Sequence, residues 1–198
     1  MEFRKMRRFR QQLTKSECDA ILSIGTSGTL ALLGDNGYPY AVPISYVYAD
    51  DKLYFHSAKT GLKVDAIRQY DKASFCVIAA DDIHPSEFTT YFRSVIAFGR
   101  IKIIESEEDR MYAASLLGTR YNPGDDAGLQ KELEKGLFHM LVLRLDIEHM
   151  TGKEAIELVR KKWPICFQRA EWVVKELSFT IINQDLDSLK NQWRYKRP

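Results

Sequence analysis

Hydrophobic and polar residues alternate along several stretches of the chain, and this alternation predicts strands. The clearest stretch is residues 38–48, in which Tyr, Val and Ile side chains occur at every second position. A period of two places these side chains on one face of an extended strand. Other stretches rich in aromatic and β-branched residues predict five more strands, over residues 30–33, 52–57, 73–80, 91–104 and 139–147.

The strand expected over residues 38–48 contains two prolines. Pro39 and Pro43 have no backbone N–H to donate to a neighbouring strand. We therefore expect this strand to be unpaired or bulged along one side. The Asn-Gly pair within residues 34–37 is typical of a tight hairpin turn that joins it to the strand before.

Apolar side chains at helical spacing predict helices between the strands. The first helix follows Thr14, where Glu17 completes the pattern of a capping box, and it ends at Gly25. The second covers residues 61–69, with Thr60 as its expected cap. Two more helices are expected over residues 106–117 and 127–135, and two near the C-terminus over residues 169–178 and 185–193.

Six strands joined by hairpin turns, with helices at the periphery, predict a mostly β fold of the α+β class. We expect the strands to form a small closed or half-closed antiparallel barrel. A doubly wound sheet is not expected, because only the helix over residues 61–69 is placed as a crossover between strands. The chain is expected to consist of a basic N-terminal arm (residues 1–13), a barrel domain (residues 14–158) and a C-terminal extension (residues 159–198).

Composition narrows the class of protein. A chain of 198 residues with 45% hydrophobic residues has room for one domain with a substantial core and an extension. Its three cysteines are scattered, so neither a disulfide framework nor a zinc site is indicated. The longest uncharged stretch, residues 20–34, is too short and too rich in glycine for a membrane span. We expect a cytoplasmic protein that does not enter a membrane.

Charge is distributed unevenly along the chain, although the net charge is only +2. Residues 1–10 and 159–198 are basic, and the body between them is acidic. Affinity for nucleic acid depends on many lysine and arginine contacts with phosphates, which an acidic body does not offer. We therefore expect the basic ends to pack against or beside the body, and nucleic acid is not an expected partner.

The segment from residue 54 to residue 63 is the strongest candidate for a binding site. A strand ends at Ser57, a small polar loop follows, and a helix begins with Gly61 and Lys63 in its first turn. The N-terminus of a helix favours an anion because its N–H groups are free and its dipole is positive there. Together with the hydroxyls of Ser57 and Thr60, this arrangement is suited to a phosphate monoester. In the alternative interpretation, Thr60 only caps the helix and Lys63 is a solvated lysine.

His56 is the one histidine beside this segment. It is a candidate proton donor or cofactor contact, and the alternative is a hydrogen-bonded histidine with a structural role. Gly-x-Gly-x-x-Gly and Gly-x-Ser-x-Gly do not occur, and the four histidines lack the spacing of metal ligands. A dinucleotide fold, a serine hydrolase and a metal site are therefore not expected.

Four segments in a fixed order give the chain a resemblance to a known family. They are GYPYAVPISY at residues 37–46, LYFHSAKTGLK at 53–63, YFRSVIAFGR at 91–100 and TGKEA at 151–155. Over residues 14–158 the chain resembles the pyridoxamine 5′-phosphate oxidase-related, FMN-binding split-barrel superfamily. Within that superfamily it is most similar to the nitroimidazole-resistance branch.

The resemblance implies a six-stranded split barrel that forms a homodimer with FMN at the interface. It also implies an oxidoreductase that reduces a small nitroimidazole or nitroaromatic molecule with electrons from NADH or NADPH. The flavin supplies the redox chemistry, so no catalytic triad is expected and His56 is the only candidate catalytic side chain. By position, the expected flavin contacts are His56, Ser57, Leu62 and Lys63 around the phosphate and ribityl chain, the backbone of Pro43, Ile44 and Ser45 along the isoalloxazine ring, and Ser94.

One departure from the family pattern bears on the substrate. Leu62 stands where the better-known oxidases use an arginine-rich phosphate clamp. This departure implies weaker phosphate binding, or a phosphate held instead by the helix start, Lys63 and a partner subunit. It also argues against pyridoxamine phosphate as the substrate, because the basic substrate-phosphate site of those oxidases has no counterpart in this sequence. Alternatives on the same fold are a haem- or deazaflavin-binding protein, with His56 or His84 as the haem contact, and a flavin-binding sensor or binding module without turnover.

Overall fold

The structure of the chain is a computed structural model, which describes residues 2–161. The strands in this range are β1 (Ser27–Leu33), β2 (Pro39–Ser45), β3 (Val47–Ala49), β4 (Lys52–Ser57), β5 (Lys72–His84), β6 (Thr89–Ile103) and β7 (Leu141–Glu154). The α-helices are α1 (Lys15–Ile24), α2 (Leu62–Gln69), α3 (Glu107–Tyr121), α4 (Asp126–Gly136) and α5 (Ile156–Lys161). The helices expected over residues 169–178 and 185–193 lie outside the described residues.

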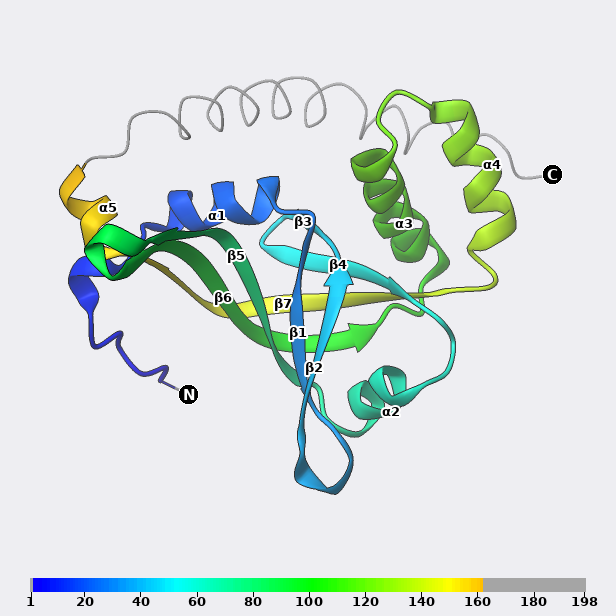
Figure 1. Ribbon diagram of the computed structural model, residues 1–198. Helices are drawn as coiled ribbons and strands as arrows, with labels where there is room; N and C mark the ends of the chain where they lie inside the picture. The colour runs from blue at the N-terminus through cyan, green and yellow to red at the C-terminus, as the bar shows by residue number, and fades with distance from the viewer. Residues whose placement is uncertain (1, 162–198) are drawn as a thin grey trace.

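The seven strands form one antiparallel sheet in the order β2-β1-β5-β6-β7-β4-β3 (Figure 1). The expected mostly β, α+β fold is therefore confirmed. β2 and β3 follow each other in the chain but lie at opposite ends of this order, and the sheet curls until β2 lies beside β4. β2 and β4 are not paired in the sheet, and the line between them, which we call the seam, is where the barrel is split.

The sheet has seven strands rather than the expected six, because the strand predicted over residues 38–48 breaks at Tyr46. Before the break β2 pairs with β1, and after it β3 pairs with β4. The Tyr46 ring is fully buried, and its hydroxyl donates to the Leu22 carbonyl at 2.8 Å. The backbone N–H and carbonyl of Tyr46 both lie within hydrogen-bond distance of the Tyr121 hydroxyl. These bonds fix the point at which the chain changes its partner strand.

The two prolines of β2 occupy positions whose backbone groups do not bond to β1, so their missing N–H groups remove no hydrogen bond between the two strands. The Gly34 N–H donates to the Tyr38 carbonyl at 2.8 Å, and the Tyr46 N–H donates to the Thr26 carbonyl at 3.4 Å. Hydrogen-bonded and non-bonded pairs alternate along an antiparallel ladder. By this alternation Tyr40, Val42 and Ile44 bond to β1, and Pro39, Ala41, Pro43 and Ser45 direct their backbone groups toward the seam. The expectation of a strand that is unpaired along one side is confirmed.

The interior of the barrel is the main hydrophobic core. Phe75 is fully buried there, and Tyr46 and Phe55 pack edge-on against its ring at centroid distances of 4.8 and 5.2 Å. α1 and α2 cover the core from different sides (Figure 1). A second cluster lies on the other face of β4, where α3 packs against Tyr54 and Val142. No helix within residues 2–161 is both long and apolar enough to cross a membrane.

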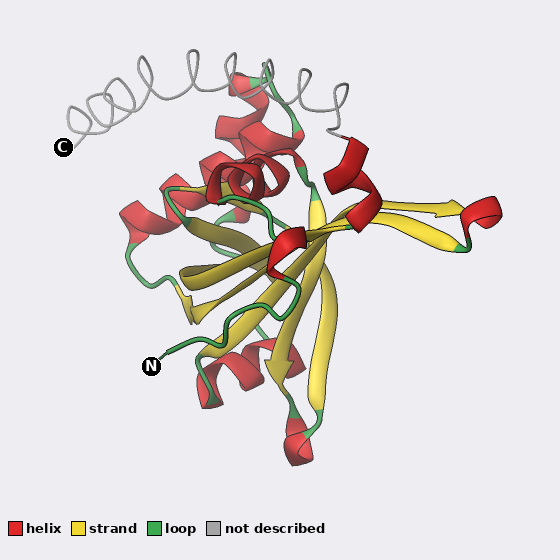
Figure 2. Ribbon diagram, turned by 90° about the vertical axis from the view of Figure 1, so that its left-hand side faces the viewer, coloured by secondary structure: helices red, strands yellow, loops and turns green. Residues whose placement is uncertain are grey.

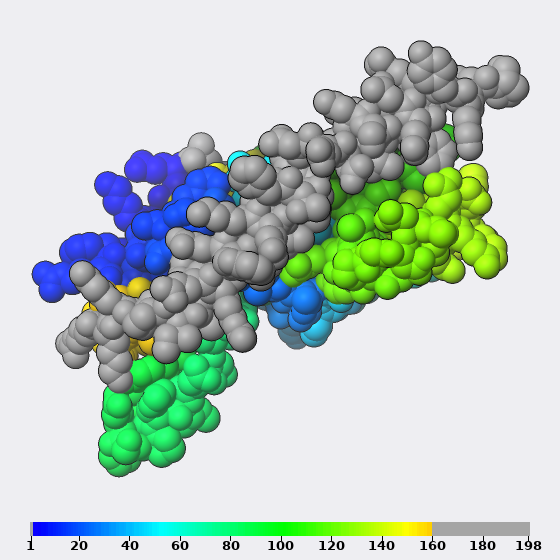
Figure 3. All heavy atoms as spheres, turned by 90° about the horizontal axis from the view of Figure 1, so that it is seen from above, coloured from blue at the N-terminus to red at the C-terminus, as the bar shows by residue number. Residues whose placement is uncertain are grey.

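β5 and β6 are longer than the sequence predicts, and they leave the barrel together as a two-stranded arm (Figure 2). β5 does not end near residue 80 but continues to His84, and the turn Pro85–Glu87 then leads into β6. The His84 ring stacks on the Tyr91 ring at a centroid distance of 3.7 Å, which stiffens the end of the arm. The arm also stands out at the lower left of Figure 3, in green.

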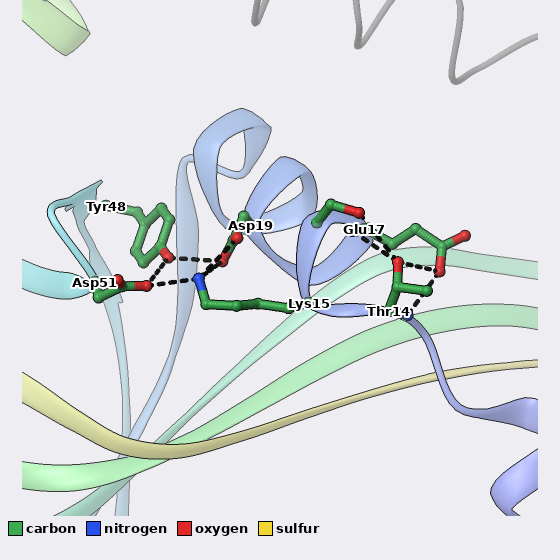
Figure 4. Close-up of polar contacts among 7 residues, drawn as sticks. Thr14, Lys15, Glu17, Asp19, Tyr48 and Asp51 are labelled. Carbon is green, nitrogen blue, oxygen red and sulfur yellow. Dashed lines mark hydrogen bonds and ion pairs between the residues drawn. The ribbon is translucent and has the colours of Figure 1, made fainter.

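α1 is attached to the turn between β3 and β4 by a polar network (Figure 4). The helix begins with the predicted capping box of Thr14 and is therefore fixed at its first turn. Lys15 Nζ lies 2.9 Å from the Asp19 carboxylate and 2.7 Å from the Asp51 carboxylate. The Tyr48 hydroxyl reaches the same two carboxylates, at 2.7 and 3.0 Å. The network thus joins a helix to a turn more than thirty residues along the chain.

Tyr48→Phe is expected to make folding less sensitive to alkaline pH. Burial, helped by the bonds to Asp19 and Asp51, raises the pKa of the Tyr48 phenol above its ordinary value. The neutral phenol therefore stabilises the fold below the ordinary tyrosine pKa of about 10, and this contribution is lost as the pH rises beyond it. Urea unfolding from ~pH 8 to ~pH 11 should show a fall in wild-type stability above ~pH 10 and a shallower fall in the variant.

Tyr38→Phe is the matched control, because the Tyr38 side chain is 74% exposed. Its stability should fall as steeply with pH as that of the wild type. Burial also raises the pKa of Tyr46 and Tyr112, so part of the fall remains in Tyr48→Phe. At ~pH 8 that variant should lose about 1 kcal/mol, the usual contribution of one hydrogen bond. An unchanged pH dependence in Tyr48→Phe would contradict the role assigned to its hydroxyl.

Candidate functional site

The candidate site starts where β4 ends and α2 begins. Ser57, the last residue of β4, has a buried side chain, and residues 58–60 form an exposed loop. Gly61 precedes α2 with φ 121° and ψ 165°, a conformation that is essentially restricted to glycine. Its carbonyl accepts the Val64 N–H at 2.8 Å, which starts the helix. The prediction that Thr60 caps α2 is wrong, because the backbone of Gly61 takes the cap position and leaves Thr60 outside it.

The N-terminus of α2 is open to an anion. Gly61 has no side chain to cap the helix, so the first N–H groups, those of Leu62 and Lys63, keep their free donor capacity. The helix dipole adds positive potential at the same place. The amine of Lys63 is half-buried, and burial lowers its pKa with no carboxylate to offset the effect among the described residues. A bound phosphate would compensate this charge and accept the free N–H groups.

Ser57 and His56 point to opposite faces of β4. The Phe55 side chain is part of the barrel core, and alternation along the strand places Ser57 on the same inner face. His56 faces the other way and is exposed, on a strand position paired with Val142 of β7. Ser57 therefore lies on the inner face of β4, a short loop before Leu62 and Lys63 of α2, while the imidazole of His56 leaves β4 on the opposite side. The catalytic role of His56 stays a prediction.

The backbone of residues 43–45 borders the seam. The Ile44 side chain packs against the barrel core, whereas Pro43 is exposed on the outside of β2. The carbonyl of Pro43 and the N–H and carbonyl of Ser45 are directed away from β1 by the alternation of the ladder. The Pro43 carbonyl and the Ser45 N–H are thus an acceptor and a donor side by side on a free strand edge. Such a pair can form hydrogen bonds with the polar edge of a planar ring.

Ser94 lies far from the start of α2 within one chain, although it is at the same level of the sheet as Ser45, three strands away. It is on the outer face of β6, beside Ile78 of β5, while α2 lies against the far part of β6. The end of β4 is level with the far end of β6. His56 of β4 pairs with Val142 of β7, and the next residue of β7, Leu143, pairs with Ile103 of β6. Nine residues of strand separate Ser94 from Ile103, roughly 30 Å at 3.3 Å per residue. The chain does not bring Ser94 to the start of α2.

Tyr121 is a further residue next to the seam, and sequence reasoning did not identify it. Its hydroxyl lies 3.1 Å from the Tyr46 nitrogen and 3.0 Å from the Tyr46 carbonyl oxygen. The two residues are far apart in sequence, and the pattern placed Tyr121 in a turn after the helix expected over residues 106–117. No local spacing in the sequence could have revealed this contact.

Metal ligands do not cluster within residues 2–161, where no group of three or more His, Cys, Asp or Glu side chains is suited to a metal ion. A shallow hollow at the start of α3 is also unlike the candidate site. It is lined by Lys102 and Arg144 together with acidic residues. Arg144 lies 2.8 Å and Lys102 3.3 Å from the Asp146 carboxylate, so both cations already have a partner.

Comparison with known proteins decides the family. The sequence model described as pyridoxamine 5′-phosphate oxidase matches residues 14–154. The chain belongs to the pyridoxamine 5′-phosphate oxidase family. The family indicated by the four sequence segments is therefore confirmed. The matched range ends with β7, so all seven strands of the sheet belong to the part shared with the pyridoxamine 5′-phosphate oxidase family.

Individual proteins that are similar to this chain are distant from it in sequence. Protein RA0666 of Rhizobium meliloti, an uncharacterized protein, is 27% identical over 156 residues, which cover 74% of this chain and 96% of the relative. The structure of an FAD and haem binding protein from Mycobacterium smegmatis is 25% identical, with a TM-score of 0.64 over 83% of this chain and 80% of that one. An FAD-binding protein from Mesorhizobium loti is 26% identical, with a TM-score of 0.54 over 73% of this chain and 97% of that one.

A third structure bears on the fold alone. It is a protein from Bacteroides thetaiotaomicron named for 5-nitroimidazole antibiotic resistance. It is 19% identical to this chain, with a TM-score of 0.59 over 72% of this chain and 86% of that one. These likenesses support the split-barrel fold of the pyridoxamine 5′-phosphate oxidase family, which this chain builds with seven strands.

Proposed function

We propose that this member of the pyridoxamine 5′-phosphate oxidase family binds FMN and reduces a small nitroimidazole or nitroaromatic molecule with electrons from NADH or NADPH. The observation that carries the proposal is the start of α2, an uncapped helix N-terminus beside the half-buried Lys63. Such a site is suited to a phosphate group, which FMN carries. Two relatives described as FAD-binding support a flavin as the ligand class.

The seam offers a place for the isoalloxazine ring. The Pro43 carbonyl and the Ser45 N–H would meet the donor and acceptor groups at the polar edge of the ring. The bound flavin would supply the redox chemistry, and the protein would hold and orient it. Leu62 offers no charge for a second phosphate, and for this reason we propose a nitro compound rather than pyridoxamine phosphate as the substrate.

A homodimer would complete the site. Ser94 shares the outer face of the β5–β6 pair with Ile78 and Ile96, whose side chains are 67% and 37% exposed. Exposed isoleucines side by side on a sheet face are typical of a surface that a partner covers. A second copy packed on this face would carry its own Ser94 to the flavin of the first. The distance between Ser94 and α2 within one chain is then no obstacle to a shared site.

Ile78→Asp is expected to prevent dimerisation and to weaken FMN binding, since it places a charge in the proposed interface. Light scattering coupled to gel filtration should show a dimer for the wild type and a monomer for the variant. Phe138→Asp is the control, because Phe138 is 69% exposed but lies between α4 and β7, away from the outer face. A wild-type monomer that binds FMN, or a dimer that survives in Ile78→Asp, would contradict the proposed interface.

A visible spectrum tests the proposed reaction. Protein mixed with FMN and passed through gel filtration should keep the flavin absorption band. Addition of NADH or NADPH without oxygen should bleach this band, and a nitroimidazole should restore it. A flavin that neither donor reduces would favour a sensor without turnover, and a Soret band would favour haem with His56 or His84 as the contact. Loss of all flavin on gel filtration would overturn the proposal.

A further inference from the structure

At the break between β2 and β3 the side chain of Tyr46 is anchored in the core, and its backbone groups bond to one hydroxyl group from a distant helix. The Tyr46 N–H donates to the Tyr121 hydroxyl oxygen at 3.1 Å, and the hydroxyl lies 3.0 Å from the Tyr46 carbonyl oxygen. It also contacts the Thr26 carbonyl at the start of β1. A phenol accepts hydrogen bonds while donating its single proton, so it can satisfy the N–H and one carbonyl at the same time.

The neighbouring residue strengthens this attachment. Arg120 Nη2 donates to the Ile24 carbonyl at 2.5 Å and lies 3.4 Å from the Gly25 carbonyl. The last turn of α3 therefore holds both the connection from α1 to β1 and the end of β2. Within residues 2–161, the only other bond to the Tyr46 N–H is the long one of 3.4 Å to the Thr26 carbonyl. Without the Tyr121 hydroxyl, the Tyr46 side chain would stay anchored to the Leu22 carbonyl, but the backbone N–H of Tyr46 would keep only this long bond.

Residues 43–45 come directly before this point. β2 has a neighbour on one side only, so its free edge is held by the ladder to β1 and by the contacts at Tyr46. A shift at Tyr46 moves the Ser45 N–H and the Pro43 carbonyl, the groups that face the seam. We infer that Tyr121 is a positioning residue, which acts through Tyr46 to place the backbone groups that meet the flavin ring. This inference rests on the proposed flavin function.

Tyr121→Phe tests the inference, because it keeps the ring and removes the hydroxyl. We expect the variant to bind FMN about three- to tenfold more weakly, with a shift in the visible absorption bands of the bound flavin. Riboflavin should lose the same factor, since the hydroxyl acts on the ring and not on the phosphate. In the protein without flavin, amide hydrogen exchange in the peptide spanning residues 41–48 should become faster.

Tyr112→Phe is the matched control on the same helix. The Tyr112 hydroxyl donates to the Asp50 carboxylate at 3.1 Å, so its loss also removes a hydrogen bond between α3 and the barrel. It should leave both flavin affinities and the exchange of residues 41–48 unchanged. Equal effects of the two substitutions, or wild-type affinity and exchange in Tyr121→Phe, would overturn the inference. If the wild type binds neither flavin, the proposed function itself fails, while the exchange result still reports whether Tyr121 holds β2.

Discussion

Lys63→Met is expected to weaken FMN binding about tenfold, or about 1.4 kcal/mol, without destabilising the protein. Burial lowers the pKa of the Lys63 amine, which means that the folded state disfavours its charged form. This penalty is present at neutral pH and disappears as the pH rises through the lowered pKa toward the ordinary value. Methionine has a similar length and no charge, so the flavin-free variant should unfold at the same urea concentration as the wild type or a higher one. The positive charge of Lys63 is expected to contribute to FMN binding and not to folding.

Lys59→Met is the control for this substitution. Lys59 is in the exposed loop before α2 and carries the same charge, yet it lies outside the helix start. It should keep wild-type affinity for FMN. Riboflavin has no phosphate, so Lys63→Met should leave its affinity unchanged. A variant that binds FMN as tightly as the wild type but unfolds more easily would show that Lys63 has a structural role.

Gly99→Ala is expected to have the largest effect on stability. A Cβ atom at this position would lie 2.0 Å from the Asp146 carbonyl oxygen and 2.9 Å from its carbonyl carbon. Both are backbone atoms of β7, at the point where the β6–β7 register shifts between Phe98 and Gly99. Neither strand can yield without breaking the ladder, so we expect a loss of roughly 3 kcal/mol or more in the free energy of unfolding. Urea unfolding followed by circular dichroism measures it.

Gly136→Ala is the control that shows whether the loss of stability is specific to the register shift at Gly99. Gly136 ends α4, and a Cβ atom there would meet nothing within 4 Å. This variant should be as stable as the wild type or gain a few tenths of a kcal/mol from the better helix propensity of alanine. Two glycine variants of equal stability would contradict the close approach of β6 to Asp146.

The strands were predictable where local pattern decides them. Residue types placed β4 at residues 52–57 correctly, and the prolines of β2 correctly indicated a side without ladder bonds. The seventh strand was not predictable, because the break at Tyr46 depends on the Tyr121 hydroxyl from a helix far along the chain. Alternation continues through the break, so the pattern alone reads as one strand.

The candidate site divides in the same way. The helix start with Gly61 and Lys63 follows from residue types and short spacing, which are local properties. The cap was assigned to Thr60 because a hydroxyl usually caps, and the positive φ of Gly61 could not be read from the sequence. The separation of Ser94 from the start of α2 depends on strand register. Strand register is determined by contacts across the whole sheet and not by the local sequence.

The affinity of the wild-type protein for FMN and for riboflavin tests the central claim most directly. Both ligands are fluorescent, so titration of each with purified protein gives two dissociation constants under the same conditions. We expect saturable binding of FMN and binding of riboflavin that is weaker by about a hundredfold, or about 2.7 kcal/mol, the contribution of the phosphate at the start of α2. Equal affinities would show that α2 does not hold the phosphate, and no binding of either ligand would contradict a flavin site in this chain.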